Sequence, residues 1–153
     1  MTKKYTFAQY GAIYGLVTLF PLFPVLAIIP SVAFAYGIEV LGTTCEIGYL
    51  AALLLASVCA FLIVFFYLRH LPYTLKKNSK ALVLHFGLWS ALLYVMTSTI
   101  SFILYVGVDA ACHGDGQTGL AVFFSAPFAS ISLVVFGIMV DVKRKKLLEI
   151  PSN

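Results

Sequence analysis

Four apolar stretches constrain this chain more than any other feature, because each is long enough to cross a lipid bilayer. They cover about residues 11–37, 49–68, 81–106 and 119–140. Since a helix rises about 1.5 Å per residue, about 20 apolar residues cross a hydrocarbon layer about 30 Å thick. Only 10% of the residues are charged, whereas soluble domains average about 25%. We therefore predict an all-α integral membrane protein with four transmembrane helices.

Short polar connections join the four stretches, at about residues 38–48, 69–80 and 107–118. Helices joined by short connections pack as antiparallel neighbours. No stretch is left over that could form a separate soluble domain. We therefore predict one domain over residues 1–153, a four-transmembrane-helix antiparallel bundle.

The basic residues predict how this bundle lies in its membrane. Of the three connections, those at 38–48 and 107–118 contain no Lys or Arg. Basic residues concentrate on the cytoplasmic side of membrane proteins. We therefore expect a multi-pass protein of the cell membrane, inner or plasma, with both termini in the cytoplasm. All ten Lys and Arg residues lie in the two terminal segments and the 69–80 connection: Lys3, Lys4, Arg69, Lys76, Lys77, Lys80, Lys143, Arg144, Lys145 and Lys146.

The net charge of +4 does not indicate a nucleic-acid partner. Binding nucleic acid requires a broad basic face with base-stacking aromatic residues, whereas these basic residues form short runs beside apolar stretches. The last run is expected to attract anionic lipid headgroups, at about 1 kcal/mol per basic residue. It consists of Lys143, Arg144, Lys145 and Lys146.

Two cysteines, Cys45 and Cys112, lie one in each of the connections expected outside the cell. Disulfides persist in that oxidising compartment. We therefore predict a disulfide between them, which would join the first helical hairpin to the second. The third cysteine, Cys59, lies within an apolar stretch and is expected to act as a small apolar residue.

Two other roles for the outer cysteines are less well supported. In helix number the chain is similar to the four-helix membrane oxidoreductases that pass electrons from thiols to quinone, but that chemistry needs a Cys-x-x-Cys pair, and each connection has a single cysteine. Zinc could be held by a mixed set of Cys45, Cys112, His113 and Asp115, but their spacing is not typical of a zinc site. We expect no metal site, cofactor or catalytic residue.

The first apolar stretch contains Pro21, Pro24 and Pro30. Each proline removes a backbone donor, so the helix should kink. Transporters use broken helices to expose backbone groups to a substrate, but membrane helices also tolerate proline without such a role. We expect one bent helix over 11–37.

Polar side chains follow one face of the third stretch at helical spacing. They could line a narrow polar cavity, or they could form hydrogen bonds between helices at about 0.6 kcal/mol each. We favour the second interpretation, because no charged residue accompanies them. A further contact, between His85 and Asp141, is expected to join the third and fourth helices at their inner ends. The stripe consists of Tyr94, Thr97, Ser98, Ser101 and Tyr105.

These features favour a non-enzymatic binding or accessory protein that acts on another membrane protein. Bacterial immunity proteins against pore-forming toxins are similar in size, helix number and topology, and a subunit of a larger membrane complex fits equally well. A small-molecule carrier or channel, built around Tyr94–Tyr105 and the kinked first helix, is the alternative. A thiol–quinone oxidoreductase is the least favoured, because the paired cysteines are missing.

Overall fold

The computed structural model describes residues 6–75, 79–113 and 116–149, and every regular element in these ranges is a helix. Four of the helices, α2, α3, α4 and α6, are long and apolar enough to cross a membrane. The all-helical class and the four membrane-length helices are therefore confirmed. In chain order the helices are α1 (Phe7–Thr18), α2 (Leu22–Val40), α3 (Cys45–Thr74), α4 (Ser79–Val106), α5 (Val108–His113) and α6 (Gly116–Glu149).

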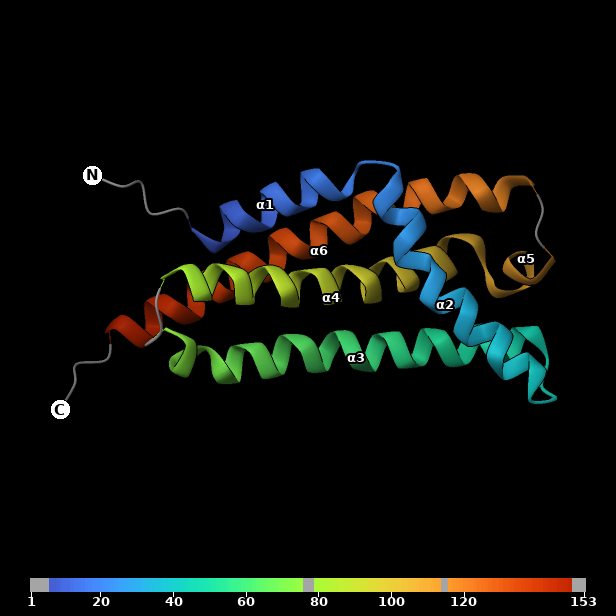
Figure 1. Cartoon of the computed structure of the whole chain (residues 1–153), viewed down its shortest axis with the longest axis horizontal. Helices are drawn as coiled ribbons and strands as arrows, with labels where there is room; N and C mark the ends of the chain where they lie inside the picture. The colour runs from blue at the N-terminus through green and yellow to red at the C-terminus, as the bar shows by residue number, and fades with distance from the viewer. Residues whose placement is uncertain (1–5, 76–78, 114–115, 150–153) are drawn as a thin grey trace.

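Helix α4 lies at the centre of the molecule, between α3 and α6, and α1 packs against α6 (Figure 1). Helix α2 leaves α1, crosses α4 and reaches the start of α3. The starts of α1 and α4 and the ends of α3 and α6 lie at one end of the molecule, which we call the basic end (Figure 1). The short helix α5, the end of α2 and the starts of α3 and α6 lie at the other, the cystine end.

The first apolar stretch, expected as one bent helix over 11–37, is instead two helices, α1 and α2. Pro21 has no N–H group, so it cannot donate to the carbonyl of Val17 four residues earlier. That carbonyl accepts instead from the N–H of Phe20, at 3.1 Å. This tighter bond ends α1, and α2 begins after Pro21 in a different direction (Figure 1).

Helices α3 and α6 extend beyond the predicted stretches 49–68 and 119–140. They contain 30 and 34 residues, which correspond to lengths of about 45 and 51 Å. Both lengths exceed the hydrocarbon thickness of about 30 Å. Their ends can therefore carry the polar residues that were expected in connections, such as Glu46 at the start of α3 and Lys143–Lys146 near the end of α6.

The buried residues form two clusters along the bundle. The cluster toward the basic end is aromatic, with the rings of Phe86 and Phe136 stacked at 5.3 Å. The cluster toward the cystine end includes Tyr49. Many other large apolar side chains face outward, and Phe61 and Leu84 are 69% and 77% exposed. An outer surface this apolar suits a lipid environment rather than water.

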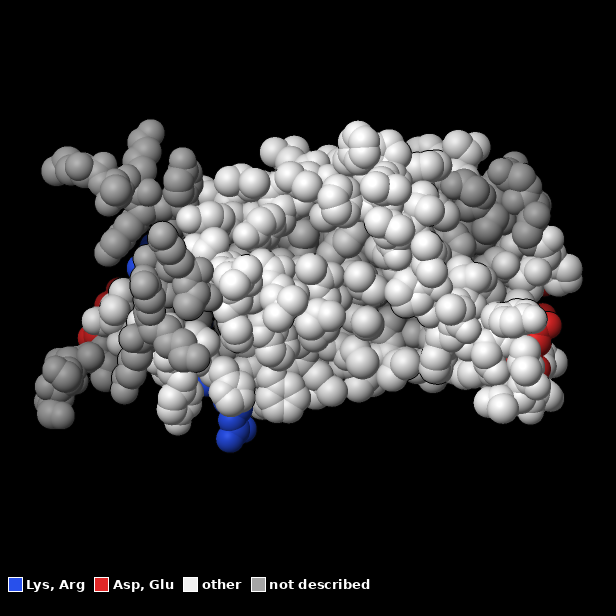
Figure 2. All heavy atoms as spheres, viewed as in Figure 1, with Lys and Arg blue, Asp and Glu red and all other residues white. Residues whose placement is uncertain are grey.

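The described basic residues lie at one end of the molecule, whereas acidic residues lie at both ends. On the face drawn in Figure 2, the Lys and Arg side chains appear only at the basic end. Arg69 lies near the end of α3, and Lys143–Lys146 lie near the end of α6. Helix ends toward the cystine end carry Glu39, Glu46 and Asp109. Outside the described residues lie Lys3, Lys4, Lys76, Lys77 and Asp115.

Candidate functional site

Hydroxyl groups satisfy the backbone where α1 ends. The Tyr94 hydroxyl of α4 donates to the Thr18 carbonyl at 3.0 Å. The Thr18 hydroxyl donates to the Gly15 carbonyl at 2.9 Å and lies 3.1 Å from the Ser130 hydroxyl of α6. Irregular backbone within a membrane requires partners of this kind, because lipid offers none. The break between α1 and α2 is therefore joined by hydrogen bonds to both α4 and α6.

A cavity of about 420 Å³ lies beside the break and is lined by α1, α2 and α4, with Leu133 of α6. We call it the break cavity. Its volume is within the range of about 300–1,000 Å³ that is common for small-molecule sites. Thr18 and Tyr94 line it, and most other lining residues are apolar, among them Leu26 and Val95.

Sequence reasoning missed Ser90, one of the residues that line the break cavity. It is 1% exposed, and its hydroxyl has no hydrogen-bond partner among the described residues. A buried hydroxyl without a partner is uncommon and costs free energy. The available signal was the spacing, because Ser90 lies four residues before Tyr94 on one face of α4. The predicted stripe therefore began one turn too late.

The predicted stripe of α4 faces several neighbours rather than one cavity. Of its five members, Tyr94 alone lines the break cavity. The Thr97 hydroxyl lies 3.0 Å from the Ser132 hydroxyl and so links α4 to α6. The last three members are buried, half-buried and exposed, in this order: Ser98, Ser101 and Tyr105.

A second hollow, of about 640 Å³, runs between α3 and α6 with α4 as its floor. We call it the α3–α6 groove. Its α6 wall extends from Phe128 to Met139, about 16 Å of helix. The hydroxyls in it, Thr97 and Ser132, lie 3.0 Å apart, and each has a carbonyl of its own helix within hydrogen-bond distance. One of them can donate to the other while the other donates to its own helix. The groove therefore presents an apolar surface whose polar groups already have partners.

Asp141 of α6 holds the first turn of α1. Its carboxylate oxygens accept from the N–H groups of Phe7 at 3.1 Å and Ala8 at 2.9 Å. The first N–H groups of a helix have no partner within the helix, and a negative charge suits that end. The hydrogen bonds of Asp141 go to α1 rather than to His85, whose Nε2 accepts from Trp89 Nε1 at 3.1 Å. The prediction was based on the similar depth expected for His85 and Asp141. It did not consider that the first N–H groups of α1 need acceptors.

Replacing Asp141 by alanine should lower the free energy of unfolding by about 2–3 kcal/mol, because two hydrogen bonds to a charged acceptor are lost. Thermal unfolding of the detergent-purified protein would show this as a lower Tm. Asp141→Asn keeps a hydrogen-bond acceptor but loses the charge. Its Tm should therefore lie between that of the wild type and that of Asp141→Ala. Glu149→Ala, an exposed change on the same helix, is the matched control. Equal Tm values for Asp141→Ala and the control would contradict this role.

The basic cluster near the end of α6 is only partly available to lipid. Arg144 is half-buried, and its guanidinium carbon lies 5.8 Å from the ring centroid of Phe7. This is a cation–π contact, and it adds to the attachment of α1. The other three members, Lys143, Lys145 and Lys146, are exposed.

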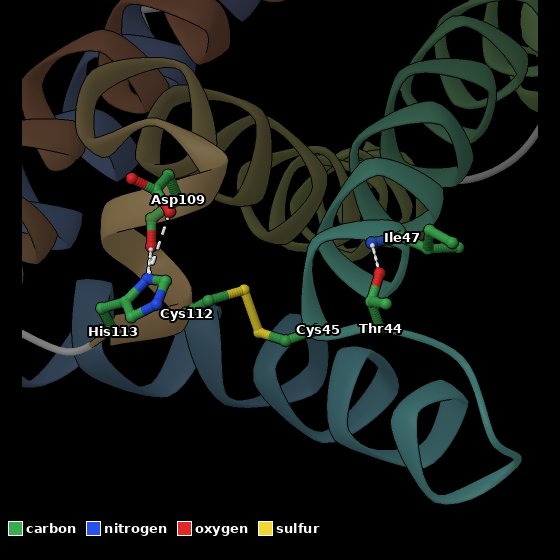
Figure 3. The surroundings of a disulfide bond; sticks show 6 residues. All are labelled: Thr44, Cys45, Ile47, Asp109, Cys112 and His113. Carbon is green, nitrogen blue, oxygen red and sulfur yellow. Dashed lines mark hydrogen bonds and ion pairs between the residues drawn. A yellow bond between two sulfur atoms is a disulfide. The ribbon is translucent and has the colours of Figure 1, made fainter.

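Cys45 and Cys112 are joined by a disulfide, as predicted, with their Cα atoms 5.9 Å apart. Figure 3 shows it between the start of α3 and the short helix α5. Thr44 caps α3 beside it, since its side chain accepts from the N–H of Ile47. Both thiols are consumed in this bond, so neither is available as a thiolate ligand for zinc. The third cysteine, Cys59, is a separate thiol, half-buried in α3.

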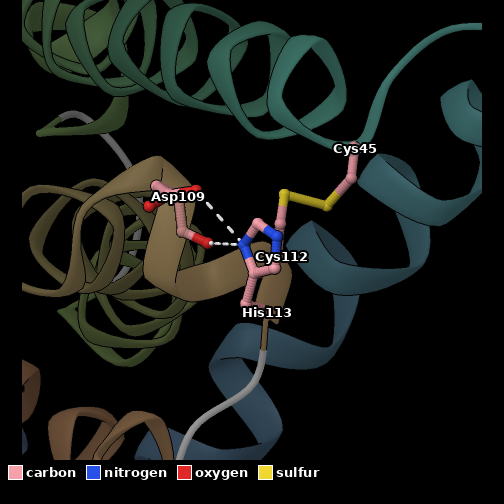
Figure 4. Close-up of polar contacts among 4 residues, drawn as sticks. All are labelled: Cys45, Asp109, Cys112 and His113. Atoms are coloured by element: carbon pink, nitrogen blue, oxygen red, sulfur yellow. Dashed lines mark hydrogen bonds and ion pairs between the residues drawn. A yellow bond between two sulfur atoms is a disulfide. The ribbon is translucent and has the colours of Figure 1, made fainter.

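His113 contacts Asp109 rather than the cysteines (Figure 4). Its Nδ1 lies 2.9 Å from the Asp109 carbonyl oxygen and 3.2 Å from the carboxylate. These oxygens raise the pKa of His113. The ion pair is therefore complete below about pH 6.5, the ordinary value for histidine, and is lost as the pH rises through the raised pKa. Both side chains are exposed, so the effect on stability is small.

The described residues contain no group of three or more His, Cys, Asp or Glu residues arranged to hold a metal ion. No known protein family, curated protein or solved structure matches this chain. The candidate sites are therefore defined by their own geometry. They are the break cavity and the α3–α6 groove.

Proposed function

We propose that this chain is a non-enzymatic binding protein of the cell inner membrane that acts on another membrane protein. A partner helix would lie in the α3–α6 groove. The role would be that of an immunity protein against a pore-forming toxin or of an accessory subunit in a membrane complex. The observation that carries the proposal is the groove itself, an apolar hollow parallel to the helices whose hydroxyls already have partners.

The proposed arrangement is an antiparallel four-helix bundle with both termini in the cytoplasm. The described basic residues lie at one end of the molecule and the disulfide lies at the other, which supports this orientation through the positive-inside rule. The disulfide would then face an oxidising compartment such as the bacterial periplasm. Lys143, Lys145 and Lys146 would lie near anionic headgroups on the cytoplasmic side.

A transmembrane helix suits the groove better than a polar molecule does. Helices in lipid associate through close packing and a few hydrogen bonds, since lipid supplies no hydrophobic drive. The small Ala60 lies on the α3 wall and lets another backbone approach. Phe61 and Phe128 line the groove and are largely exposed, so they could pack around an incoming helix.

Photo-crosslinking in native membranes tests this proposal. A photoreactive phenylalanine analogue placed at Phe61 should form a crosslink to one specific membrane protein, because Phe61 lines the groove. The matched control is the same analogue at Phe66, an exposed phenylalanine on the same helix that does not line the groove. Ala60→Trp fills the groove and should abolish the crosslink from Phe61, whereas Val58→Trp, an exposed change on α3, should not. Equal crosslinking from both positions, or none from Phe61, would refute the proposal.

A small-molecule carrier is the second candidate, and the break cavity favours it. Transporters place substrate sites beside discontinuous helices, and this cavity lies where α1 and α2 separate. A carrier would move its substrate across proteoliposomes, and filling the cavity with Ala91→Trp would stop the flux. A thiol–quinone oxidoreductase gains no support, since the described cysteines form one disulfide and one separate thiol.

A further inference from the structure

We propose that the break cavity binds an uncharged, lipid-soluble small molecule that carries a hydrogen-bond acceptor such as a carbonyl oxygen. The proposal does not depend on the partner protein suggested above, because the break cavity and the α3–α6 groove share no lining residue. It combines three observations: a buried hydroxyl without a partner, apolar walls, and openings toward the bilayer.

The first observation is that Ser90 has a proton to donate. Ser90 is one of the residues that line the cavity, and its buried hydroxyl has no partner among the described residues. The other hydroxyls at the break are already engaged, since Tyr94 donates to Thr18, and Thr18 donates to Gly15. An acceptor on a bound molecule would give Ser90 the partner that it lacks.

The second observation is the position of Ser90 among apolar walls. It lies 11 residues after Ser79, the first residue of α4, which places it about 16 Å along the helix. At that depth an ion would need a partner of opposite charge. No charged residue is among those that line the cavity. The occupant is therefore neutral and largely apolar.

The third observation is that the cavity opens between exposed apolar side chains. Val17 and Leu26 line it and are each 51% exposed, and Ala91 on α4 is also exposed. In a membrane these residues face lipid, so a molecule dissolved in the bilayer reaches the cavity directly. The hydroxyl of Tyr14, which lies beside Gly87 one turn before Ser90, is a second group within the cavity that can contact a polar atom.

The probe for this proposal is 4-butylbenzophenone, an uncharged lipophile whose ketone is both a hydrogen-bond acceptor and a photoreactive group. The purified protein in lipid nanodiscs is irradiated with increasing probe concentrations, and labelled peptides are identified by mass spectrometry. Saturable labelling of the α2 and α4 segments that contain Leu26 and Val95 is expected. Ser90→Ala should weaken the apparent affinity about fivefold, which corresponds to one neutral hydrogen bond. Ser57→Ala, an exposed serine bonded to its own helix, should leave it unchanged.

Filling the cavity provides the second comparison. Ala91→Trp should reduce saturable labelling more than tenfold, whereas Leu92→Trp, an exposed neighbour outside the cavity, should not. Ala60→Trp in the groove should also leave labelling unchanged, which separates this test from that of the proposed function. An unchanged thermal stability of each variant confirms that it is folded. Labelling that does not saturate, or that is the same in Ala91→Trp as in the wild type, overturns the site. An unchanged apparent affinity of Ser90→Ala for the probe overturns the ligand class.

Discussion

Gly137→Ala should lower the free energy of unfolding by about 3 kcal/mol, because the added methyl group meets backbone rather than a movable side chain. A Cβ at Gly137 would lie 2.8 Å from the Phe7 carbonyl carbon and 2.9 Å from the Ala8 Cα. Both atoms belong to the start of α1, so the whole helix would have to move away from α6. Gly11 on α1 has the same relation to the backbone of Leu133 on α6.

Gly37→Ala is the matched control for this change. Gly37 lies inside α2 with nothing within 4 Å of its would-be Cβ. An alanine there should raise stability slightly, by about 0.5–1 kcal/mol, since glycine weakens a helix interior. Thermal unfolding in detergent would compare the two variants. If both changed Tm by the same amount, the close approach of α1 to α6 would be refuted.

Removing the disulfide should cost about 4 kcal/mol by the loop-entropy model, because Cys45 and Cys112 are 67 residues apart. This is a large share of the free energy of unfolding of a typical protein, which is about 5–15 kcal/mol. Cys45→Ser, Cys112→Ser and the double variant should therefore all show the same large fall in Tm. Cys59→Ser, which removes the separate thiol, should change it little.

The same cysteines also test which way the protein lies in its membrane. After mild reduction of intact cells, a membrane-impermeant maleimide should label Cys45 and Cys112 from outside. A Cys59→Ser background limits the reaction to these two thiols. Labelling that appears only after the cells are lysed would reverse the proposed orientation.

The sequence predicted the number of membrane-length helices because apolar length alone decides whether a segment can cross a bilayer. The disulfide was also predictable, since the two cysteines lie in connections on the same side of the predicted topology. The break between α1 and α2 was only half predicted. Pro21 indicated a kink, but whether a proline bends or ends a helix depends on neighbours, here Tyr94 and Ser130, that hold the separated turns.

The candidate sites were harder to predict, because they depend on how each helix is rotated and tilted. The position of Asp141 along its helix was readable from the sequence, and it lies near the end of α6. That position did not indicate that α1, rather than His85, would supply the partner for Asp141. Similarly, the pattern of hydroxyls along α4 did not distinguish Ser90, whose hydroxyl has no partner among the described residues, from Thr97, whose hydroxyl lies against Ser132 of α6.

The break lets the first apolar stretch pack against two different helices. Helix α1 is fastened to α6 through Asp141 and the close approach at Gly11 and Gly137. Helix α2 is fastened to α3, where Gly48 would bring a Cβ within 2.7 Å of the Ala35 carbonyl oxygen. Any change of the angle between α1 and α2 must be absorbed by the few residues from Thr18 to Leu22. A molecule seated beside these residues would act as a wedge that sets the angle between α1 and α2.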